Sequence, residues 1–415
     1  MKTNIIPSLN PVLGIDNKRW SHTLARKQVY KFLQRLQGGQ LLVEEAGEVN
    51  SFGHCEDAAH PIIVVNINDS RFWLDIAMNG GLGAGESYIQ GRWSCNNLVA
   101  LLRLMLRNLP MSDGMDRINI AWQAAQQAWH RMRRNTLTGS RDNIRAHYDL
   151  SNSLFSLFLD ARMMYSSAYY PTPDMSLEQA SEAKLRLVCQ KLQLGPQDHL
   201  LEIGTGWGGL AIYAAQHFGC RVTTTTISEQ QYQYAKQAIK AAGLSKQINL
   251  LRKDYRELQG QYDKLVSIEM VEAVGHEFLS TYFKQCDQLL KPAGRMLLQA
   301  ITIRDDRYQQ ALQRVDFIKR HIFPGGFLPS LAIIKQTLQQ TTSMQPTHEE
   351  NIARHYARTL ADWKQRFDGQ YQNVLQLGYP EAFVRMWRYY LDYCQAGFLE
   401  AHLGTWQLVL DKQKS

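Results

Sequence analysis

The sequence lacks any long hydrophobic run. Nowhere in its 415 residues do about 18 apolar residues occur together, the length that a helix needs to cross a bilayer. The first twenty residues also lack the continuous apolar segment after a basic start that marks a secretory signal peptide. We therefore expect a cytoplasmic chain with no membrane-spanning helix.

The six cysteines lack the spacing of a metal site. They form no C-x-x-C pair, and no histidine cluster accompanies them, so we expect a reducing compartment, no structural zinc and no other bound metal. Low-complexity tracts are absent too, while 45% of the residues are hydrophobic and 20% are charged. This composition is that of an ordinary globular protein, and the length predicts two domains.

Positive charge is in excess, with a formal net charge of +8. The sign alone suits nucleic acid and an anionic membrane equally. Between residues 115 and 145, however, a segment with a helical pattern mixes arginine, tryptophan and methionine: Arg117, Arg131, Arg133, Arg134, Arg141, Arg145, Trp122, Trp129, Met115 and Met132. This mixture is typical of a helix at a membrane interface. We expect an anionic membrane surface, not nucleic acid, as the partner; the alternative is a solvated basic face.

The first 110 residues predict a small mixed α/β domain. Strand-like runs cover residues 61–69 and 71–78, and an apolar helix follows residue 96. The glycine-rich segment GLGAGESYIQGRW at 81–93 predicts a loop that shapes a surface, because no Lys-Ser or Lys-Thr follows it as in a P-loop. We place an N-terminal lipid-binding or accessory domain at residues 1–135, including a basic linker helix, and a catalytic domain at 136–415.

From Ser176 onward the pattern alternates. Ser176 and Gln179 form a predicted capping box for a helix that ends near residue 194. Strand-like stretches at 199–204, 220–227, 248–254, 263–270 and 294–303 then alternate with helical ones at 207–217, 229–243 and 277–290. This order predicts a doubly wound, mainly parallel sheet. Beyond residue 303 we expect helices interrupted by one turn at 322–329.

The first strand-to-helix turn of that sheet reads LEIGTGWGG, residues 201–209. Glycines at the carboxyl end of a parallel strand allow a ligand to approach the backbone, so we expect a nucleoside here. The second strand ends in Thr226, Ile227 and Ser228 without an acidic ribose ligand, which weighs against NAD. After the third strand, Asp254 and Tyr255 are suited to an adenine ring, with a helix cap as the alternative for Asp254.

Further motifs follow in order along the chain: HYDLSN at 147–152, YSSAYY at 165–170, DYR at 254–256, EAVG at 272–275 and IFPGG at 322–326. Together with the glycine loop and the segment at 81–93, they resemble the cyclopropane fatty acid synthase family, which includes the mycolic acid cyclopropane synthases. The resemblance implies a Rossmann-like class I methyltransferase. It would bind S-adenosylmethionine and convert unsaturated acyl chains of membrane phospholipids into cyclopropane fatty acids.

The resemblance also assigns cofactor residues: Tyr165, Ser166, Gly204, Thr205, Gly206, Gly208, Gly209, Thr226, Ile227, Ser228, Gln231, Asp254 and Tyr255. An alkene is a poor nucleophile, so the enzyme must hold the sulfonium methyl in line with it and stabilise the resulting carbocation. Aromatic faces and a nearby carboxylate favour such a cation.

A bicarbonate ion is implied as the acceptor of the last proton. By resemblance, Glu272, Ile301 and Tyr356 would hold it, together with Ser167 and Gln299, which replace a cysteine and a histidine of the family. Serine and glutamine can donate hydrogen bonds to an oxyanion, but glutamine cannot shuttle a proton. A methyl- or methylene-branched product without ring closure is therefore the alternative.

Three candidates have a plainer alternative. Glu272 could cap the helix that follows its strand, and His147 could be a surface residue. Cys394 matches a family cysteine sometimes treated as catalytic, yet alkene methylation needs no thiolate, so a buried structural cysteine is favoured.

Two other functions, and the formation of a homodimer, are alternatives that the sequence leaves open. A small polar acceptor would need a polar pocket, whereas the chain offers an apolar cluster: Phe317, Ile318, Ile322, Phe323, Phe327 and Leu328. The other rival is a noncatalytic lipid-binding protein. We expect peripheral association with the inner face of the membrane and leave a homodimer open.

Overall fold

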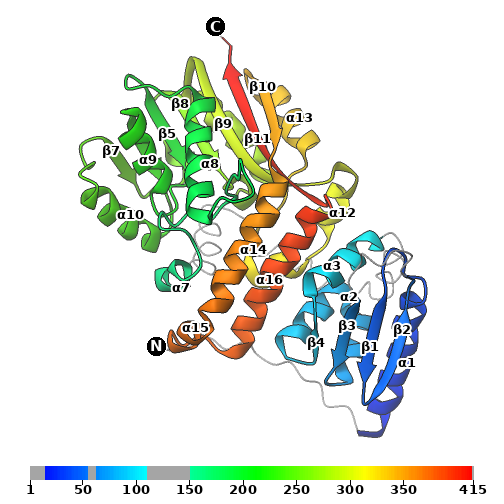
Figure 1. Cartoon of the computed structure of the whole chain (residues 1–415). Coiled ribbons are helices and arrows are strands. Elements are labelled where there is room, and N and C mark those ends of the chain that lie inside the picture. Colours follow the sequence, from blue (N-terminus) through cyan, green and yellow to red (C-terminus); the bar gives the residue numbers. More distant parts are fainter. Residues whose placement is uncertain (1–14, 55–61, 110–149, 414–415) are drawn as a thin grey trace. The chain divides into compact units, whose positions relative to one another are not determined.

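The computed structural model describes residues 15–54, 62–109 and 150–413, which Figure 1 draws in colour. They belong to two compact units, one within residues 1–119 and the other within residues 120–415. The predicted boundary at 135, the basic segment at 115–145 and His147 all lie outside the described residues. No helix among the described residues is long and apolar enough to cross a membrane.

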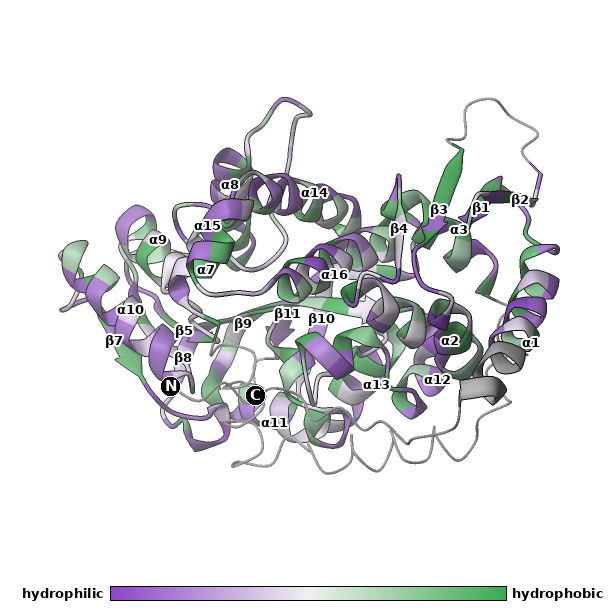
Figure 2. Ribbon diagram, turned by 90° about the horizontal axis from the view of Figure 1, so that it is seen from below, coloured by the Kyte–Doolittle hydropathy of each residue, from purple (hydrophilic) through white to green (hydrophobic). Residues whose placement is uncertain are grey.

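The N-terminal unit is a four-stranded sheet with three helices. Its elements are α1 (Ile15–Leu33), β1 (Leu41–Glu45), β2 (Glu48–Phe52), β3 (Ile63–Ile67), α2 (Arg71–Ile89), β4 (Trp93–Cys95) and α3 (Leu98–Arg107). The strand order is β2-β1-β3-β4, with β1 and β3 parallel and the other pairs antiparallel. Strand β3, coloured as hydrophobic in Figure 2, buries alternate residues in the core. The predicted small mixed α/β domain is confirmed.

Two local predictions in this unit were wrong. The expected strand at 71–78 and most of the expected loop at 81–93 form the single helix α2, which has a kink at Gly80 (φ 53°). A Cβ on Gly83 would lie 2.0 Å from the carbonyl oxygen of Asp75, so this glycine permits close backbone packing around the kink. The glycines therefore serve helix packing, which the sequence pattern did not distinguish from a loop.

The C-terminal unit is built on a seven-stranded sheet. Its strands are β5 (His199–Ile203), β6 (Arg221–Thr225), β7 (Ile248–Leu251), β8 (Tyr262–Ile268), β9 (Leu290–Ile303), β10 (Met344–Asn351) and β11 (Leu403–Lys412). Their order is β10-β11-β9-β8-β5-β6-β7, and the five strands from β5 to β9 run parallel.

Ten helices accompany this sheet in the described residues: α7 (Asn152–Ser156), α8 (Leu177–Leu192), α9 (Gly209–Phe218), α10 (Glu229–Ala241), α11 (Leu279–Leu289), α12 (Tyr308–Gln313), α13 (Leu331–Thr341), α14 (Ala353–Gly369), α15 (Tyr371–Gln376) and α16 (Glu381–Leu399). Short 3₁₀ turns occupy Tyr255–Glu257, Val271–Ala273, His276–Phe278 and Asp305–Arg307, and a π-helical turn occupies Ile318–Ile322. The capping box of Ser176 and Gln179 at the start of α8 is confirmed.

Helices cover both faces of the sheet because successive strand residues point to opposite sides. Leu201 and Leu265 pack in a core with residues of α11 and α13. Their neighbours Leu200 and Val266 pack in a second core with residues of α8 and α9. The doubly wound, mainly parallel sheet is thus confirmed.

The expectation of helices alone after residue 303 was wrong. Strand β11 pairs antiparallel with β9, and β10 pairs antiparallel with β11 at the edge of the sheet. Strand β10 reads MQPTHEEN, with little apolar alternation, because an edge strand has one free side and much of it faces solvent. Such a strand carries no hydrophobic period for a sequence pattern to detect.

Candidate active site

The glycine loop after β5 has a backbone that favours glycine. Gly204, Gly206 and Gly208 have φ values of 98°, 55° and 93°, in the left-handed region. A Cβ on Gly209 would lie 2.6 Å from the sulfur of Met164, whereas a Cβ on Gly206 would meet no atom within 4 Å. The backbone at Gly206 therefore borders open space that a ligand can approach, as the predicted nucleoside site requires. Thr205 anchors the loop to β6, since its N–H donates to the carbonyl oxygen of Thr225 at 2.9 Å.

The end of β6 carries a small polar network. Thr226 donates its hydroxyl to Oε1 of Gln231 at 2.8 Å, and Ser228 caps α10 by accepting the Gln231 N–H. Ile227, between them, is partly exposed. These residues follow β6 at the same sheet edge as the glycine loop, so the structure brings both predicted cofactor segments to one place.

Asp254 and Tyr255 follow β7 at that edge too. The Asp254 carboxylate caps the turn Tyr255–Glu257 and forms an ion pair with Arg256 at 2.8 Å, so the cap considered as its alternative role is present. Tyr255 is buried in the core, where its ring packs 5.4 Å from that of Tyr282. Their contact with adenine stays a prediction.

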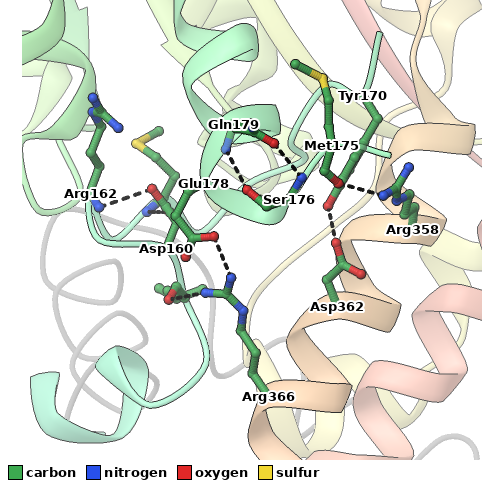
Figure 3. Close-up of polar contacts among 12 residues, drawn as sticks. Asp160, Arg162, Tyr170, Met175, Ser176, Glu178, Gln179, Arg358, Asp362 and Arg366 are labelled. Atoms are coloured by element: carbon green, nitrogen blue, oxygen red, sulfur yellow. Dashed lines mark hydrogen bonds and ion pairs between the residues drawn. The ribbon is translucent and has the colours of Figure 1, made fainter. Parts of the chain in front are cut away.

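Helix α14 contacts the chain between Tyr170 and the first turn of α8, just after Ser167, as Figure 3 shows. Arg366 of α14 forms an ion pair with Glu178 at 2.7 Å, and Tyr170 donates its hydroxyl to Asp362 at 2.8 Å. Arg358 donates to the main chain of the same segment at 2.7 Å. These contacts attach the irregular stretch before α8 to helix α14.

Three predicted catalytic residues meet at a carboxylate that the sequence reasoning missed. Glu269 follows β8 directly, and its Oε1 accepts hydrogen bonds from the backbone N–H of Ser167 at 3.0 Å and from Nε2 of Gln299 at 2.7 Å. Its Oε2 accepts from the Tyr356 hydroxyl at 2.7 Å. The Ser167 hydroxyl points elsewhere and donates to the carbonyl of Ala168, so this residue contributes its main chain and not its side chain.

The orientation of the Gln299 amide follows from its neighbours. Lys191 can only donate, and its Nζ lies 2.7 Å from Oε1 of Gln407. Nε2 of Gln407 therefore donates to Oε1 of Gln299 at 2.9 Å, which directs Nε2 of Gln299 toward Glu269. This series of hydrogen bonds orients the Gln299 amide so that its Nε2 donates to the Glu269 carboxylate.

Glu272 lies three residues further on, in a different environment. Its Oε1 accepts the N–H of Ile301 at 2.5 Å, and its Oε2 is buried without a partner among the described residues. Burial, followed by the negative charge of Glu269, raises the pKa of Glu272 to about 8. Burial raises the pKa of Glu269 as well, but its hydrogen-bond donors and Lys184 oppose that shift. Because three donors contact Glu269 and one contacts Glu272, we assign the charge of the pair to Glu269 and a proton to Glu272.

Aromatic rings enclose Tyr165. Its hydroxyl lies 2.9 Å from that of Tyr390, and the rings of Phe155 and Trp363 lie 5.2 and 5.3 Å away. Phe155 also lies 5.0 Å from Trp207 of the glycine loop, which links the aromatic cluster to the predicted cofactor site. Electron-rich faces of this kind stabilise a nearby cation.

Ser166 contacts a second ionisable residue that the sequence reasoning missed. The Nζ of Lys184, which is completely buried, donates to Oγ of Ser166 at 3.0 Å. Burial lowers the pKa of Lys184 to about 8, against the attraction of Glu269, Asp160 and Glu202. The positive charge of this lysine is attracted by three carboxyl groups, but its hydrogen bond is to Ser166.

Cys394 on α16 has the properties of a structural residue. Burial raises the pKa of its thiol far above the usual range, so the thiolate is not formed near neutral pH. The apolar cluster of the sequence analysis is largely buried: Phe317, Ile322 and Phe327 are 2%, 2% and 5% exposed. Phe323, which is less buried, lies 6.5 Å from the Tyr165 ring and so joins this cluster to the aromatic enclosure.

Comparison with known proteins identifies the family to which the chain belongs. The family model described as mycolic acid cyclopropane synthetase matches residues 135–408. The chain belongs to this family.

Relatives and solved structures agree with that assignment. The chain is 36% identical to cyclopropane-fatty-acyl-phospholipid synthase of Escherichia coli, over 84% of this chain and 87% of that protein. It is 35% identical to tuberculostearic acid methyltransferase UfaA1 of Mycobacterium tuberculosis, over 81% of this chain and 80% of that protein. The structure of cyclopropane synthase MmaA2 from Mycobacterium tuberculosis matches with a TM-score of 0.62 at 29% identity, covering 66% of this chain and 98% of that one. This member of the family is thus an S-adenosylmethionine-dependent C-methyltransferase-type enzyme with the predicted class I fold.

Proposed function

We propose that this cyclopropane synthetase family member methylates the double bond of unsaturated acyl chains in membrane phospholipids, with a cyclopropane ring as the expected product. The observation that carries the proposal is the aromatic enclosure of Tyr165, which continues through Trp363 to Tyr356, a hydrogen-bond donor to the Glu269 carboxylate. A Cβ on Gly204 would lie 3.1 Å from the side chain of Met270, the residue after Glu269, so the glycine loop lies next to the segment that carries the carboxylate. The site therefore combines a place for the cofactor with surroundings suited to a carbocation.

Each group has a part in this chemistry. S-adenosylmethionine, when bound along the glycine loop, supplies an electrophilic methyl group. The π electrons of the alkene form a bond to that methyl carbon as its bond to sulfur breaks and leaves its electron pair on sulfur, and positive charge develops on the neighbouring chain carbon. The rings of Tyr165 and Tyr356 and the Glu269 charge stabilise it, while buried walls exclude water that would otherwise trap it as an alcohol.

The second candidate product is a methyl-branched chain that contains a double bond. It arises when the cation loses a proton from a neighbouring carbon of the acyl chain instead of from the new methyl group, so that an alkene forms in place of the ring. Similarity to a protein named tuberculostearic acid methyltransferase supports this candidate.

We also propose that the enzyme works in the cytoplasm, at the inner face of an anionic membrane. The net charge of +8 and the arginine- and tryptophan-containing sequence at 115–145 support this proposal. A homodimer is compatible with it but is not required by any contact described above.

The test uses purified protein, vesicles and S-adenosylmethionine labelled with ¹³C in the methyl group. Vesicles of monounsaturated phosphatidylglycerol and phosphatidylethanolamine should produce S-adenosylhomocysteine, whereas vesicles of saturated lipids should not. The two candidate products have the same mass, so NMR must distinguish ring protons at high field from vinyl protons. Equal turnover with and without unsaturated lipid would reject the acyl substrate, and binding without turnover would favour a noncatalytic lipid-binding protein.

A further inference from the structure

The residues present do not fit a bound bicarbonate. Resemblance to the family implies that such an ion would accept hydrogen bonds around Ser167, Gln299 and Tyr356. In the structure these three groups already donate to the carboxylate of Glu269, at 3.0, 2.7 and 2.7 Å. A carboxylate and a bicarbonate both present planar, negatively charged oxygen atoms, so they compete for the same donors. A second anion beside Glu269 would also be repelled by its charge.

We propose that the carboxylate of Glu269 takes the place of bicarbonate and is itself the proton acceptor, so that the reaction needs no bicarbonate. This inference rests on the proposed acyl methylation. After methyl transfer from the sulfonium donor, ring closure breaks a C–H bond of the new methyl group, and its electron pair joins the methyl carbon to the cationic carbon. Alkene formation instead breaks a C–H bond on a chain carbon adjacent to the cationic one, and its electron pair becomes the second bond of the alkene. In either case the proton goes to an oxygen atom of Glu269. The product and the protonated carboxyl are then both neutral.

Glu269 suits this role better than Glu272 because its charge is supported on both oxygens. Three donors from separate segments contact Glu269, whereas Glu272 accepts one N–H, and its second oxygen is buried without a partner. An ionised carboxylate with an unpartnered buried oxygen is costly, and a proton on that oxygen removes the cost.

The backbone at Glu269 supports the same assignment. Its φ of 48° lies in the left-handed region, which a non-glycine residue adopts at a cost of about 1–2 kcal/mol. The preceding residues are regular strand, so the chain turns sharply at the residue whose side chain meets Ser167, Gln299 and Tyr356. Strain of this kind persists where the surrounding contacts compensate for it, and here those contacts are the three hydrogen bonds.

The experiment compares the full-length wild type with Glu269→Gln and Glu269→Gly. Wild-type turnover on unsaturated vesicles should change by less than twofold when bicarbonate and carbon dioxide are removed from the buffer. Glu269→Gln keeps the shape without the charge and should lower turnover about a hundredfold or more. Glu269→Gly frees the three donors, so added bicarbonate or formate should raise its residual turnover about tenfold or more. Glu349→Gln, on the exposed edge strand β10, is the matched control and should behave as wild type.

A binding measurement keeps this inference separate from the proposed function. In the presence of S-adenosylhomocysteine, calorimetric titration with bicarbonate should show binding to Glu269→Gly and none to wild type. Retained binding of S-adenosylhomocysteine shows that each variant is folded. If no lipid is methylated but this binding pattern holds, the proposed substrate is wrong while the place of Glu269 stands. Bicarbonate binding to wild type, loss of wild-type turnover without bicarbonate, or near-native turnover of Glu269→Gln overturns the inference.

Discussion

Replacement of Glu272 by glutamine should stabilise the protein, increasingly so as the pH rises. Glutamine matches the size of a protonated carboxyl group and can still accept the N–H of Ile301. In the wild type, the pKa of Glu272 rises from 4.5 to about 8 on folding. Between these values the folded state keeps a proton that the unfolded state has released, so the free energy of unfolding falls as the pH rises. The variant lacks this titration and should escape the loss.

The structure sets the size of this effect. A pKa difference of one unit corresponds to about 1.4 kcal/mol, so linkage alone limits the total loss for Glu272 to about 5 kcal/mol between pH 4.5 and 8. Relaxation and water penetration reduce the penalty of burying a charge. We therefore expect the advantage of Glu272→Gln to grow by about 1–3 kcal/mol between pH 6 and 8, with a gain in Tm of about 2–4 °C per kcal/mol.

The assay is thermal unfolding of the wild type, Glu272→Gln and the exposed control Glu349→Gln at pH 6, 7 and 8, followed by circular dichroism. The informative quantity is the difference in Tm between each variant and the wild type at the same pH. A difference for Glu272→Gln that stays constant or shrinks with rising pH would show that Glu272 is ionised in the folded protein. The assignment of the charge to Glu269 would then be wrong.

Three further predictions concern other parts of the molecule. Gly206→Val should abolish binding of S-adenosylmethionine without unfolding the sheet, because the new side chain would project into the open space beside the loop. The φ of 55° at this position also disfavours valine. If calorimetry showed unchanged affinity in a folded variant, the cofactor would not bind at this loop. Attachment to anionic vesicles should weaken as salt rises from about 0.05 to 0.5 M, because ions screen it; cosedimentation that is equal at both salt concentrations would contradict an electrostatic contact. Lys184→Met removes a cation that lowers the pKa of Glu269, so the acidic limb of the pH–rate profile should move to higher pH. If turnover fell at every pH while the acidic limb kept its position, the role of Lys184 would be purely structural.

Most of the sheet could be predicted because its signals are local. Short sequence patterns predict the capping of α8 at Ser176, the glycine turn at 204–209 and the buried apolar strands from β5 to β9. The elements that were missed depend on distant partners. Strand β10 is defined by pairing with β11, about sixty residues later. Helix α2 needs glycine because its kink brings the backbone at Gly83 close to the carbonyl oxygen of Asp75.

The site was predicted in part for a similar reason. Matching of motifs identified Ser167, Gln299 and Tyr356, and the structure brings them together. It did not identify Glu269, although a glutamate directly at the end of a parallel strand on the ligand edge was a usable signal. The hydrogen bond that orients Gln299 could not be predicted, because it depends on Gln407 in a strand that was itself missed.

The electrostatics of the site explain why one ionised carboxylate serves this reaction better than two. Positive charge moves from the sulfonium to the acyl carbon during methyl transfer, so the total charge of the buried site stays the same. Glu269 can balance that charge at both stages without rearrangement, which is what a preorganised site requires. If Glu272 were ionised too, the pair would bind the cation more strongly and would also hold the proton more tightly after the reaction. Burial keeps Glu269 basic enough to take the proton, while the neutral state of Glu272 and the nearby cation of Lys184 allow it to release the proton before the next turnover.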